Sequence, residues 1–362
     1  MKYQEFYEKL NLAIDKSLTN GYLKYELLYL DEIVKLANII VENTPQFEKK
    51  NYNEPIPLNN SISMTIDFFD SLNPKYSYMF QNILQERSIY NGKIESSVKF
   101  YKILGTEEQE QYGGQHRENR SEVLKNGFVH IDYSETKDDV YSITHEITHK
   151  FSQPKNQNST IKSFLGETST ITMEYLLQDF LNENDYNDEN MIHKNNRFSE
   201  TYDDACAIIF ENILIRLYKE NNHKITSDIL KKYLSSLNKD SKLFEILSSN
   251  GEKFLNEIVK SGSLQFNKRQ RYVIGTVLAS DFHSKIKENI TKKEELFYLI
   301  DILGHTDLMT NDDLSLLGKL DIPIIENGQL KIGEQSMNRL TNNYKKEIEE
   351  IKITKKNNSH QS

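Results

Sequence analysis

Two histidines, with a glutamate directly after the first, lie four positions apart in the stretch from Asp139 to Ser152 (DVYSITHEITHKFS). The three residues are His145, Glu146 and His149. On a helix, side chains four positions apart project from one face, so both imidazoles can reach a single metal ion. Glu146 is then placed to act on a metal-bound water. This stretch constrains the fold most strongly, because it requires a helix whose histidine-bearing face meets a further ligand.

The helical interpretation does not depend on the histidines. Apolar residues recur at spacings of three, four and four and form one stripe, which consists of Val140, Ile143, Ile147 and Phe151. The histidines fall on the other side, so we predict that the helix packs on a core with its histidines in more polar surroundings. Thr136 and Asp139 have the spacing of a capping box, which predicts the helix start, and Pro154 predicts its end.

A second predicted helix, residues 163–181 (SFLGETSTITMEYLLQDFL), supplies a candidate third ligand. Glu167 and Glu174 are seven residues apart and share a face of this largely apolar helix. Unpaired buried carboxylates are costly, and metal ligation or a hydrogen bond to a metal ligand would offset that cost. Two histidines and one glutamate with an open fourth position form a catalytic zinc arrangement. We therefore predict one Zn²⁺ ion; the alternative leaves both histidines on an exposed face and both glutamates solvated.

Composition excludes several classes of protein and site. The net charge of −9 and the sequence pI near 5.6 argue against a general nucleic-acid binder. Cys206 is the only cysteine, so an intrachain disulfide and a thiolate zinc site are excluded. Since no apolar run is long enough to span a bilayer and the N-terminus lacks a signal peptide's apolar core, we expect a cytoplasmic protein with no membrane partner. The sequence leaves the oligomeric state open.

The remaining patterns predict a mainly α-helical protein with a small β-element. Strands are expected at 96–104 and 128–133, paired with each other, and the second could offer its edge to an extended peptide. The polar stretch 105–127 between them is expected to be a surface loop, or alternatively a flap over a cleft. A polar loop is also expected at 182–197, and a hairpin around residues 326–329. Helices are predicted at 6–18, at 27–40, on both sides of Asn73-Pro74 within 63–90, after Ser199, within 226–260, at 271–290 and around 294–303, and a turn is predicted at Asn91-Gly92.

Three segments resemble a known family. YSETKDDVYSITHEITHKFS is similar to the metal-binding segment of the thimet oligopeptidase and oligoendopeptidase F family of zinc peptidases, and GETSTITME is similar to the family's second motif. RYVIGTVLA resembles the late helix that carries active-site tyrosines, with Tyr272 as the best match. Two features depart from the family pattern: Thr148 stands where the family usually has glycine, and SGSLQFNKRQRY has no clear match to the histidine expected upstream of that tyrosine. The chain is also much shorter than typical members.

The resemblance implies a helical zincin-like metallopeptidase domain acting on short peptides in a groove between helical lobes. It makes His145, His149 and Glu167 the zinc ligands and Glu146 the general base. It also makes Glu174 a carboxylate that does not bind the metal itself but supports the residues that do. Tyr272 becomes a candidate hydrogen-bond donor to the oxyanion, although core packing accounts for Tyr272 equally well.

The expected division of the chain is an N-terminal helical segment (1–75), a catalytic core (76–300), a C-terminal helix and hairpin segment (301–351) and a disordered tail (352–362). Two alternatives to an oligopeptidase stay open at this point. One is a zinc-binding homologue that has lost turnover and acts as a binding protein. The other is a secreted or injected effector protease that cleaves one specific protein.

Overall fold

A computed structural model describes most of the chain, in two compact units that are interleaved along the sequence. The described residues are 3–19, 30–45, 47, 55–90, 93–103, 121–124, 127–152, 160–184, 187–288, 291–305, 325–326, 329–330 and 332–359. The first unit comprises Met1–Gln46, Phe198–Asp281 and Asn311–Glu349, and the second comprises Phe47–Arg197, Phe282–Thr310 and Glu350–Ser362. The division expected from the sequence, at residues 75, 300 and 351, stays a prediction.

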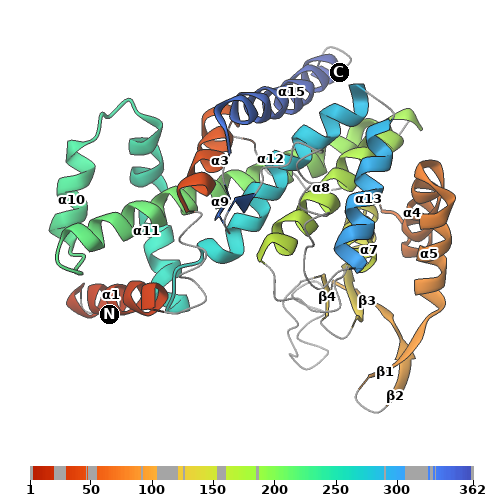
Figure 1. The fold of residues 1–362 in the computed structure, drawn as a ribbon, viewed down its shortest axis with the longest axis horizontal. Coiled ribbons are helices and arrows are strands. Elements are labelled where there is room, and N and C mark those ends of the chain that lie inside the picture. The colour runs from red at the N-terminus through yellow and green to blue at the C-terminus, as the bar shows by residue number, and fades with distance from the viewer. Residues whose placement is uncertain are drawn as a thin grey trace. The chain divides into compact units, whose positions relative to one another are not determined.

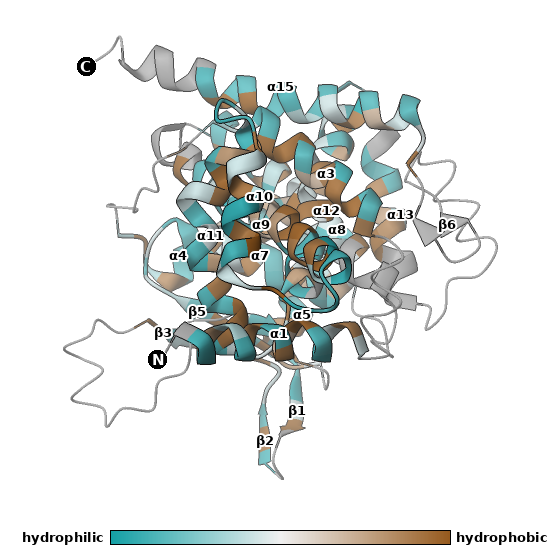
Figure 2. Cartoon of the chain, turned by 90° about the vertical axis from the view of Figure 1, so that its left-hand side faces the viewer, coloured by the Kyte–Doolittle hydropathy of each residue, from teal (hydrophilic) through white to brown (hydrophobic). Residues whose placement is uncertain are grey.

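The first unit is built from amphipathic helices. It contains α1 (Tyr3–Thr19), α3 (Leu30–Asn43), α10 (Ser227–Ser236), α11 (Lys242–Ser261), the strand pair β6 (Ile325–Glu326) and β7 (Gln329–Leu330), and most of α9 (Asn187–Glu220), α12 (Phe266–Glu288) and α15 (Glu334–Ser359). Figure 2 shows polar and apolar residues alternating along α1, whose Leu10 and Ile14 are fully buried. Gly262 ends α11 with a left-handed φ of 68°, a conformation that favours glycine. The helices predicted in these regions are confirmed.

The second unit combines helices with small strands. It contains α4 (Leu58–Leu72), α5 (Pro74–Gln85), α7 (Asp138–Phe151), α8 (Thr160–Glu183), α13 (Thr291–His305), β1 (Arg87–Tyr90), β2 (Lys93–Ser96), β3 (Val98–Lys102), β4 (Glu122–Val123) and β5 (Val129–Tyr133). In this unit α7 contacts α4, α8 and α13, and it also contacts β4 and β5 (Figure 1). The predicted fold class, mainly α with a small β-element beside the histidine-bearing helix, is therefore confirmed.

The apolar stripe of α7 anchors this helix in the core of the second unit. Val140, Ile143 and Ile147 are fully buried and Phe151 is 8% exposed, and all four belong to one hydrophobic cluster. The Phe151 ring contacts that of Phe69 on α4, with ring centroids 5.3 Å apart. Full burial of an aliphatic side chain of this size contributes about 1.5–3 kcal/mol. The stripe therefore fixes which face of α7 is left for the histidines, as the periodicity predicts.

The three-stranded sheet corrects one expectation from the sequence. β3 pairs with β5, as predicted, and the pairing is parallel; β4 pairs with β5 on its other side, so the strand order is β3-β5-β4. The prediction that the second strand, β5, offers a free edge to a peptide is therefore wrong. Only two residues form β4, Glu122 and Val123, too few to give a recognisable alternating pattern. Most of the expected loop at 105–127 lies outside the described residues.

Three other segments differ from the sequence-based expectations. Residues 87–90, expected to be helical, form β1, which pairs with β2 on the other side of the predicted Asn91-Gly92 turn. The expected loop at 182–197 is wrong, because α9 begins at Asn187. Polar residues in this first part of α9 are buried, with Lys194 only 4% and Asn195 2% exposed. A prediction from polarity treats such residues as solvated and therefore favours a loop. Residues 352–359, expected to be disordered, continue α15 as a helix.

Two further observations concern the cysteine and the hydropathy of the helices. Cys206 is buried, and burial raises the pKa of its thiol to about 12, as expected for a structural cysteine. Across the described residues, no helix combines the length and the hydropathy needed to cross a bilayer.

Candidate metal centre

The start of α7 is fixed by a carboxylate in its first turn. Asp139 Oδ1 accepts a hydrogen bond from the backbone N–H of Ser134 (2.8 Å), and its Oδ2 accepts one from the N–H of Thr136 (3.2 Å). The hydroxyl of Thr136 bonds to Ser134 Oγ instead of capping the helix, so only half of the predicted capping box forms. Asp139 thereby sets where the helix begins and, with it, the direction in which the histidines project.

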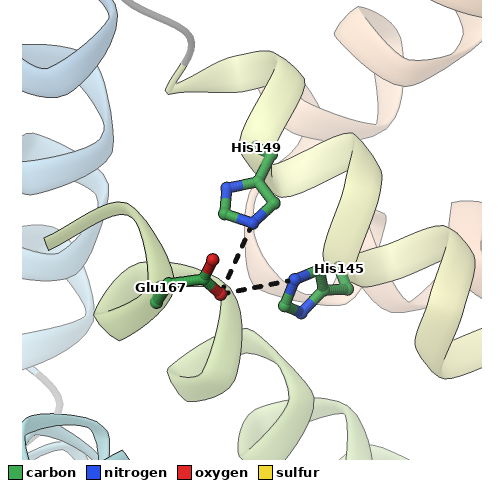
Figure 3. Close-up of side chains that lie close together, drawn as sticks. All are labelled: His145, His149 and Glu167. Atoms are coloured by element: carbon green, nitrogen blue, oxygen red, sulfur yellow. Dashed lines mark ion pairs between the residues drawn. The ribbon is translucent and has the colours of Figure 1, made fainter. Parts of the chain in front are cut away.

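The structure brings the three predicted metal ligands together. His145 and His149 lie on adjacent turns of α7, with ring centroids 4.7 Å apart. Glu167 projects from α8, and its Oε2 lies 3.6 Å from Nε2 of each histidine (Figure 3). One donor atom from each of the three residues lies within 4.8 Å of the others. The group could therefore hold a metal ion.

The spacing and chemistry of the three donors fit zinc. Tetrahedral zinc with bonds of about 2.0–2.2 Å to imidazole nitrogen and carboxylate oxygen separates its donor atoms by about 3.3–3.5 Å. The observed separations of 3.6 Å between Glu167 Oε2 and the two histidine nitrogens are close to these values. Two neutral imidazoles and one carboxylate leave a fourth position for water or substrate, as in catalytic zinc sites. The zinc ion itself stays a prediction.

The burial of these side chains contradicts the alternative in which the histidines lie on an exposed face and the glutamates are solvated. His145 is 9% exposed, Glu167 3% and Glu174 1%. The polar residues of α8 near Glu167 can be buried because their hydroxyl groups donate hydrogen bonds to backbone carbonyls of the preceding turn. Ser169 bonds in this way to Gly166, and Thr170 to Glu167. The interpretation in which the histidines and glutamates lie on an exposed face is therefore wrong.

Glu146, the predicted general base, is a buried carboxyl group with a raised pKa. It is 7% exposed, and this burial raises the pKa of its carboxyl group, although the nearby His145 and His149 act in the opposite direction. Glu167 and Glu122 of β4 raise the pKa further. A carboxylate with a raised pKa next to a polar site is suited to accept a proton during catalysis.

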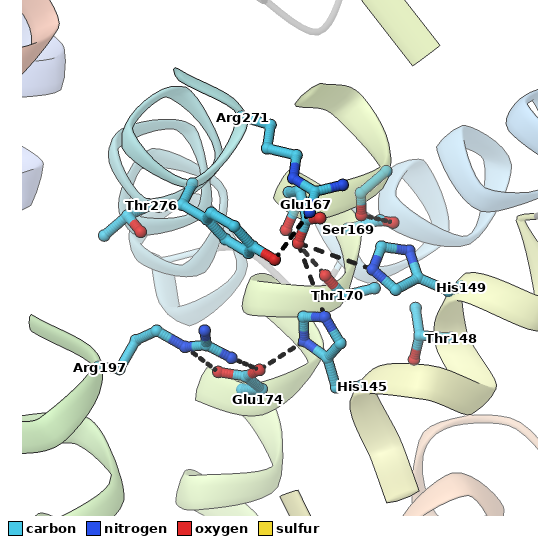
Figure 4. A network of polar contacts seen from close by, with 12 residues as sticks. His145, Thr148, His149, Glu167, Ser169, Thr170, Glu174, Arg197, Arg271 and Thr276 are labelled. Atoms are coloured by element: carbon cyan, nitrogen blue, oxygen red, sulfur yellow. Dashed lines mark hydrogen bonds and ion pairs between the residues drawn. The ribbon is translucent and has the colours of Figure 1, made fainter. Parts of the chain in front are cut away.

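Glu174 contacts the edge of the His145 ring that points away from Glu167. Its Oε1 lies 2.6 Å from Nδ1 of His145, whereas Nε2 of the same ring is the atom nearest Glu167 (Figure 4). A hydrogen bond from the second ring nitrogen of a metal-binding histidine to a carboxylate is a common support for the ligand. Glu174 thus contacts a predicted metal ligand, and its supporting role towards a metal stays a prediction.

Two residues of α9 complete this network, and the sequence-based prediction missed both. Arg197 donates from Nε and Nη2 to the two carboxylate oxygens of Glu174. His193 lies between Glu174 Oε2, 3.1 Å from its Nε2, and Asp138 Oδ1, 2.9 Å from its Nδ1. A signal was present, because His193 and Arg197 have the same four-residue spacing as His145 and His149, but the polar composition of the segment indicated a loop.

Metal-free protein is expected to become less stable as the pH rises from about 6.5 to above 9. Burial alone would lower the pKa of His193, but hydrogen bonds to Asp138 and Glu174 outweigh burial and raise it from 6.5 to about 9. Protonated His193 therefore stabilises the folded chain fully below pH 6.5, and this contribution is lost as the pH rises through 9. The shift corresponds to roughly 3 kcal/mol of unfolding free energy.

Urea denaturation at about pH 6, 8 and 10 measures this dependence on the metal-free protein. A His193→Gln variant serves as the control, because it removes the titrating group, and its unfolding free energy should change less over this range. Equal pH dependence in the wild type and the variant would contradict the assignment to His193.

Tyr272 lies on α12 in the first unit, whereas the ligand group lies in the second. Its hydroxyl accepts a hydrogen bond from Arg271 Nη2 at 3.1 Å, and the Arg271 guanidinium lies over its ring at 4.8 Å from the centroid. The role of Tyr272 towards an oxyanion stays a prediction.

Comparisons with known proteins identify a shared fold. No protein-family model and no curated protein matches the sequence. Among solved structures, the fold matches the crystal structure of a candidate peptidase from Chlamydophila abortus, with a TM-score of 0.53 and 17% sequence identity. The match covers 91% of this chain and 55% of that chain, so this chain spans about half the length of the protein that it matches.

Proposed function

We propose that the chain is a zinc-dependent endopeptidase that hydrolyses short peptides. The observation that carries this proposal is the convergence of three donors, with Glu167 Oε2 3.6 Å from Nε2 of both His145 and His149 and the buried carboxylate of Glu146 next to His145. A zinc ion held by these three residues would supply Lewis acidity, which polarises a peptide carbonyl and acidifies water. The fold shared with a candidate peptidase supports the proposal.

The residues of the chain have distinct tasks in this reaction. Glu146 accepts the proton of the attacking water and delivers it to the nitrogen of the departing amine. Glu174 fixes the ring of His145 through the 2.6 Å contact to Nδ1. The family resemblance alone assigns to Tyr272 the hydrogen bond to the oxygen that becomes negatively charged as water adds to the carbonyl.

A Tyr272→Phe variant is expected to lower kcat by about 10²–10³-fold with a smaller change in KM, because the lost hydrogen bond forms only in the transition state. Steady-state kinetics on a quenched peptide measure both constants. Tyr298→Phe, which alters a tyrosine 53% exposed on α13, is the matched control. A kcat unchanged in Tyr272→Phe would assign Tyr272 to packing alone.

Metal analysis together with a peptide-cleavage assay tests the proposed function. The wild type is expected to bind one zinc ion and to cleave peptides only when zinc is present. Stoichiometric zinc without cleavage of any peptide would contradict the peptidase and favour a binding protein. Cleavage of a folded protein but not of short peptides would contradict the proposed substrate class and favour an effector protease.

A further inference from the structure

The carboxylate of Glu174 receives every hydrogen bond that it can accept. Arg197 donates to both of its oxygens, from Nη2 to Oε1 and from Nε to Oε2 at 3.1 Å. His193 Nε2 lies 3.1 Å from Oε2, and His145 Nδ1 lies 2.6 Å from Oε1. A carboxylate offers about four lone pairs, so these four nitrogens saturate it. Figure 4 shows Arg197 approaching Glu174 from the side opposite His145.

The charges around Glu174 are balanced within the second unit. Arg197 is always protonated, and His193 is held between two carboxylates, Glu174 and Asp138, so both of its ring nitrogens donate. The His193 ring also stacks on Tyr141 of α7, with centroids 3.8 Å apart and an angle of 7° between the rings. Two cations therefore face two carboxylates. The four donors and the two cations around Glu174 keep it ionised although it is only 1% exposed.

An ionised Glu174 determines which nitrogen of His145 carries the proton. A carboxylate can only accept hydrogen bonds, so the 2.6 Å contact requires a proton on Nδ1 of His145. In that tautomer Nε2 keeps its lone pair, and Nε2 is the nitrogen that lies 3.6 Å from Glu167. The ring orientation is fixed at the same time, because Arg197 holds both oxygens of the carboxylate through two parallel N–H groups.

We propose that His193 and Arg197 are positioning residues, which hold Glu174 in one orientation and thereby keep His145 in the tautomer that can bind a metal through Nε2. The role towards the metal rests on the proposed zinc site, whereas the effect on the His145 ring does not. Asp138 and Tyr141 belong to the same arrangement, because the first bonds to His193 and the second stacks on it. These two residues precede His145 on α7 at helical spacing, so α7 carries both a metal ligand and part of its support.

The first arm of the test measures the tautomer in metal-free protein. Two-dimensional NMR of the imidazole nitrogens should show two widely different ¹⁵N shifts for His145 in the wild type, one protonated and one not. In Arg197→Met the difference between the two shifts should shrink, because the ring loses its fixed acceptor. Arg197→Lys keeps the charge but only part of the fork geometry, and should restore the difference in part. His193→Gln keeps an N–H donor without the charge and should have a smaller effect.

Lys194→Met is the matched control. Lys194 is the neighbour of His193 on α9, is 4% exposed and pairs with Glu350 at 3.9 Å, so the variant removes a buried cation outside the Glu174 network. It should leave the His145 shifts unchanged. Circular dichroism reports whether each variant folds, and if Arg197→Met does not, Arg197→Lys and His193→Gln carry the comparison. His145 shifts that are the same in the wild type and in the folded variants of Arg197 and His193 would overturn the proposal.

The second arm measures zinc affinity by competition with a chelator. Arg197→Met should bind zinc about 10–100-fold more weakly than the wild type, and Lys194→Met should match the wild type. If the wild type binds no zinc while Arg197→Met still changes the His145 shifts, the positioning role stands and the proposed zinc site fails. If zinc binds with equal affinity to the wild type and Arg197→Met, the positioning role towards the metal is wrong, and the proposed function is unaffected.

Discussion

Glu146→Gln is expected to bind zinc as the wild type does and to lose about 10²–10⁴-fold in kcat on a peptide substrate. The substitution keeps the size of the side chain but removes the group that accepts the proton of the attacking water. Zinc binding should survive, because the three converging donor atoms belong to His145, His149 and Glu167. Steady-state kinetics on a quenched peptide and metal analysis of the same preparations give the two quantities.

Glu183→Gln provides the control for Glu146→Gln. Glu183 is an exposed residue at the end of α8, so its loss should change neither turnover nor zinc content. A Glu146→Gln variant with the turnover of the wild type would show that another group moves the proton. A variant that no longer binds zinc would show instead that Glu146 belongs to the ligand set.

His149→Ala is expected to lower the zinc content from one ion per chain to none at micromolar zinc, with complete loss of peptide cleavage. The variant leaves only one imidazole and one carboxylate, whereas catalytic zinc sites use three protein ligands. His149 is less deeply buried than the other ligands, with 24% of its side chain exposed, so its truncation should leave the fold intact. Metal analysis after dialysis, together with circular dichroism, measures both effects.

His223→Ala is the matched control for His149→Ala. His223 is an exposed histidine on the loop after α9, outside the group that could hold a metal. The variant should keep the zinc content and the activity of the wild type. If His149→Ala retained one tightly bound ion while His223→Ala lost it, the metal would lie elsewhere in the chain.

The group of His145, His149 and Glu167 could be predicted because the sequence patterns that indicate it are local and periodic. The stripe of Val140, Ile143 and Ile147 determines which side of α7 enters the core, and the histidine spacing determines where the ligands lie on the other side. Glu167 follows from the need of a buried carboxylate for a partner. Each of these inferences uses the geometry of a single helix, which the sequence specifies well.

The support around Glu174 could not be predicted in the same way. Polar residues dominate the first part of α9, and a helix whose polar side chains are buried by charge pairing has the composition of a loop. His193 and Arg197 can be assigned a role only once their contacts with Glu174 on α8 are known. The periodicity of a sequence does not specify such long-range contacts. The sheet order is a similar case, because β4 contributes only two residues beside β5.

Cleavage of a peptide library by the wild type, analysed by mass spectrometry with and without a chelator, is the strongest single test of a zinc-dependent endopeptidase. We expect products from internal bonds of short peptides in the presence of zinc, no products after chelation, and recovery when zinc is added back. Products that persist unchanged in the chelated protein, or the absence of any product from protein carrying one zinc ion per chain, would contradict the proposed function.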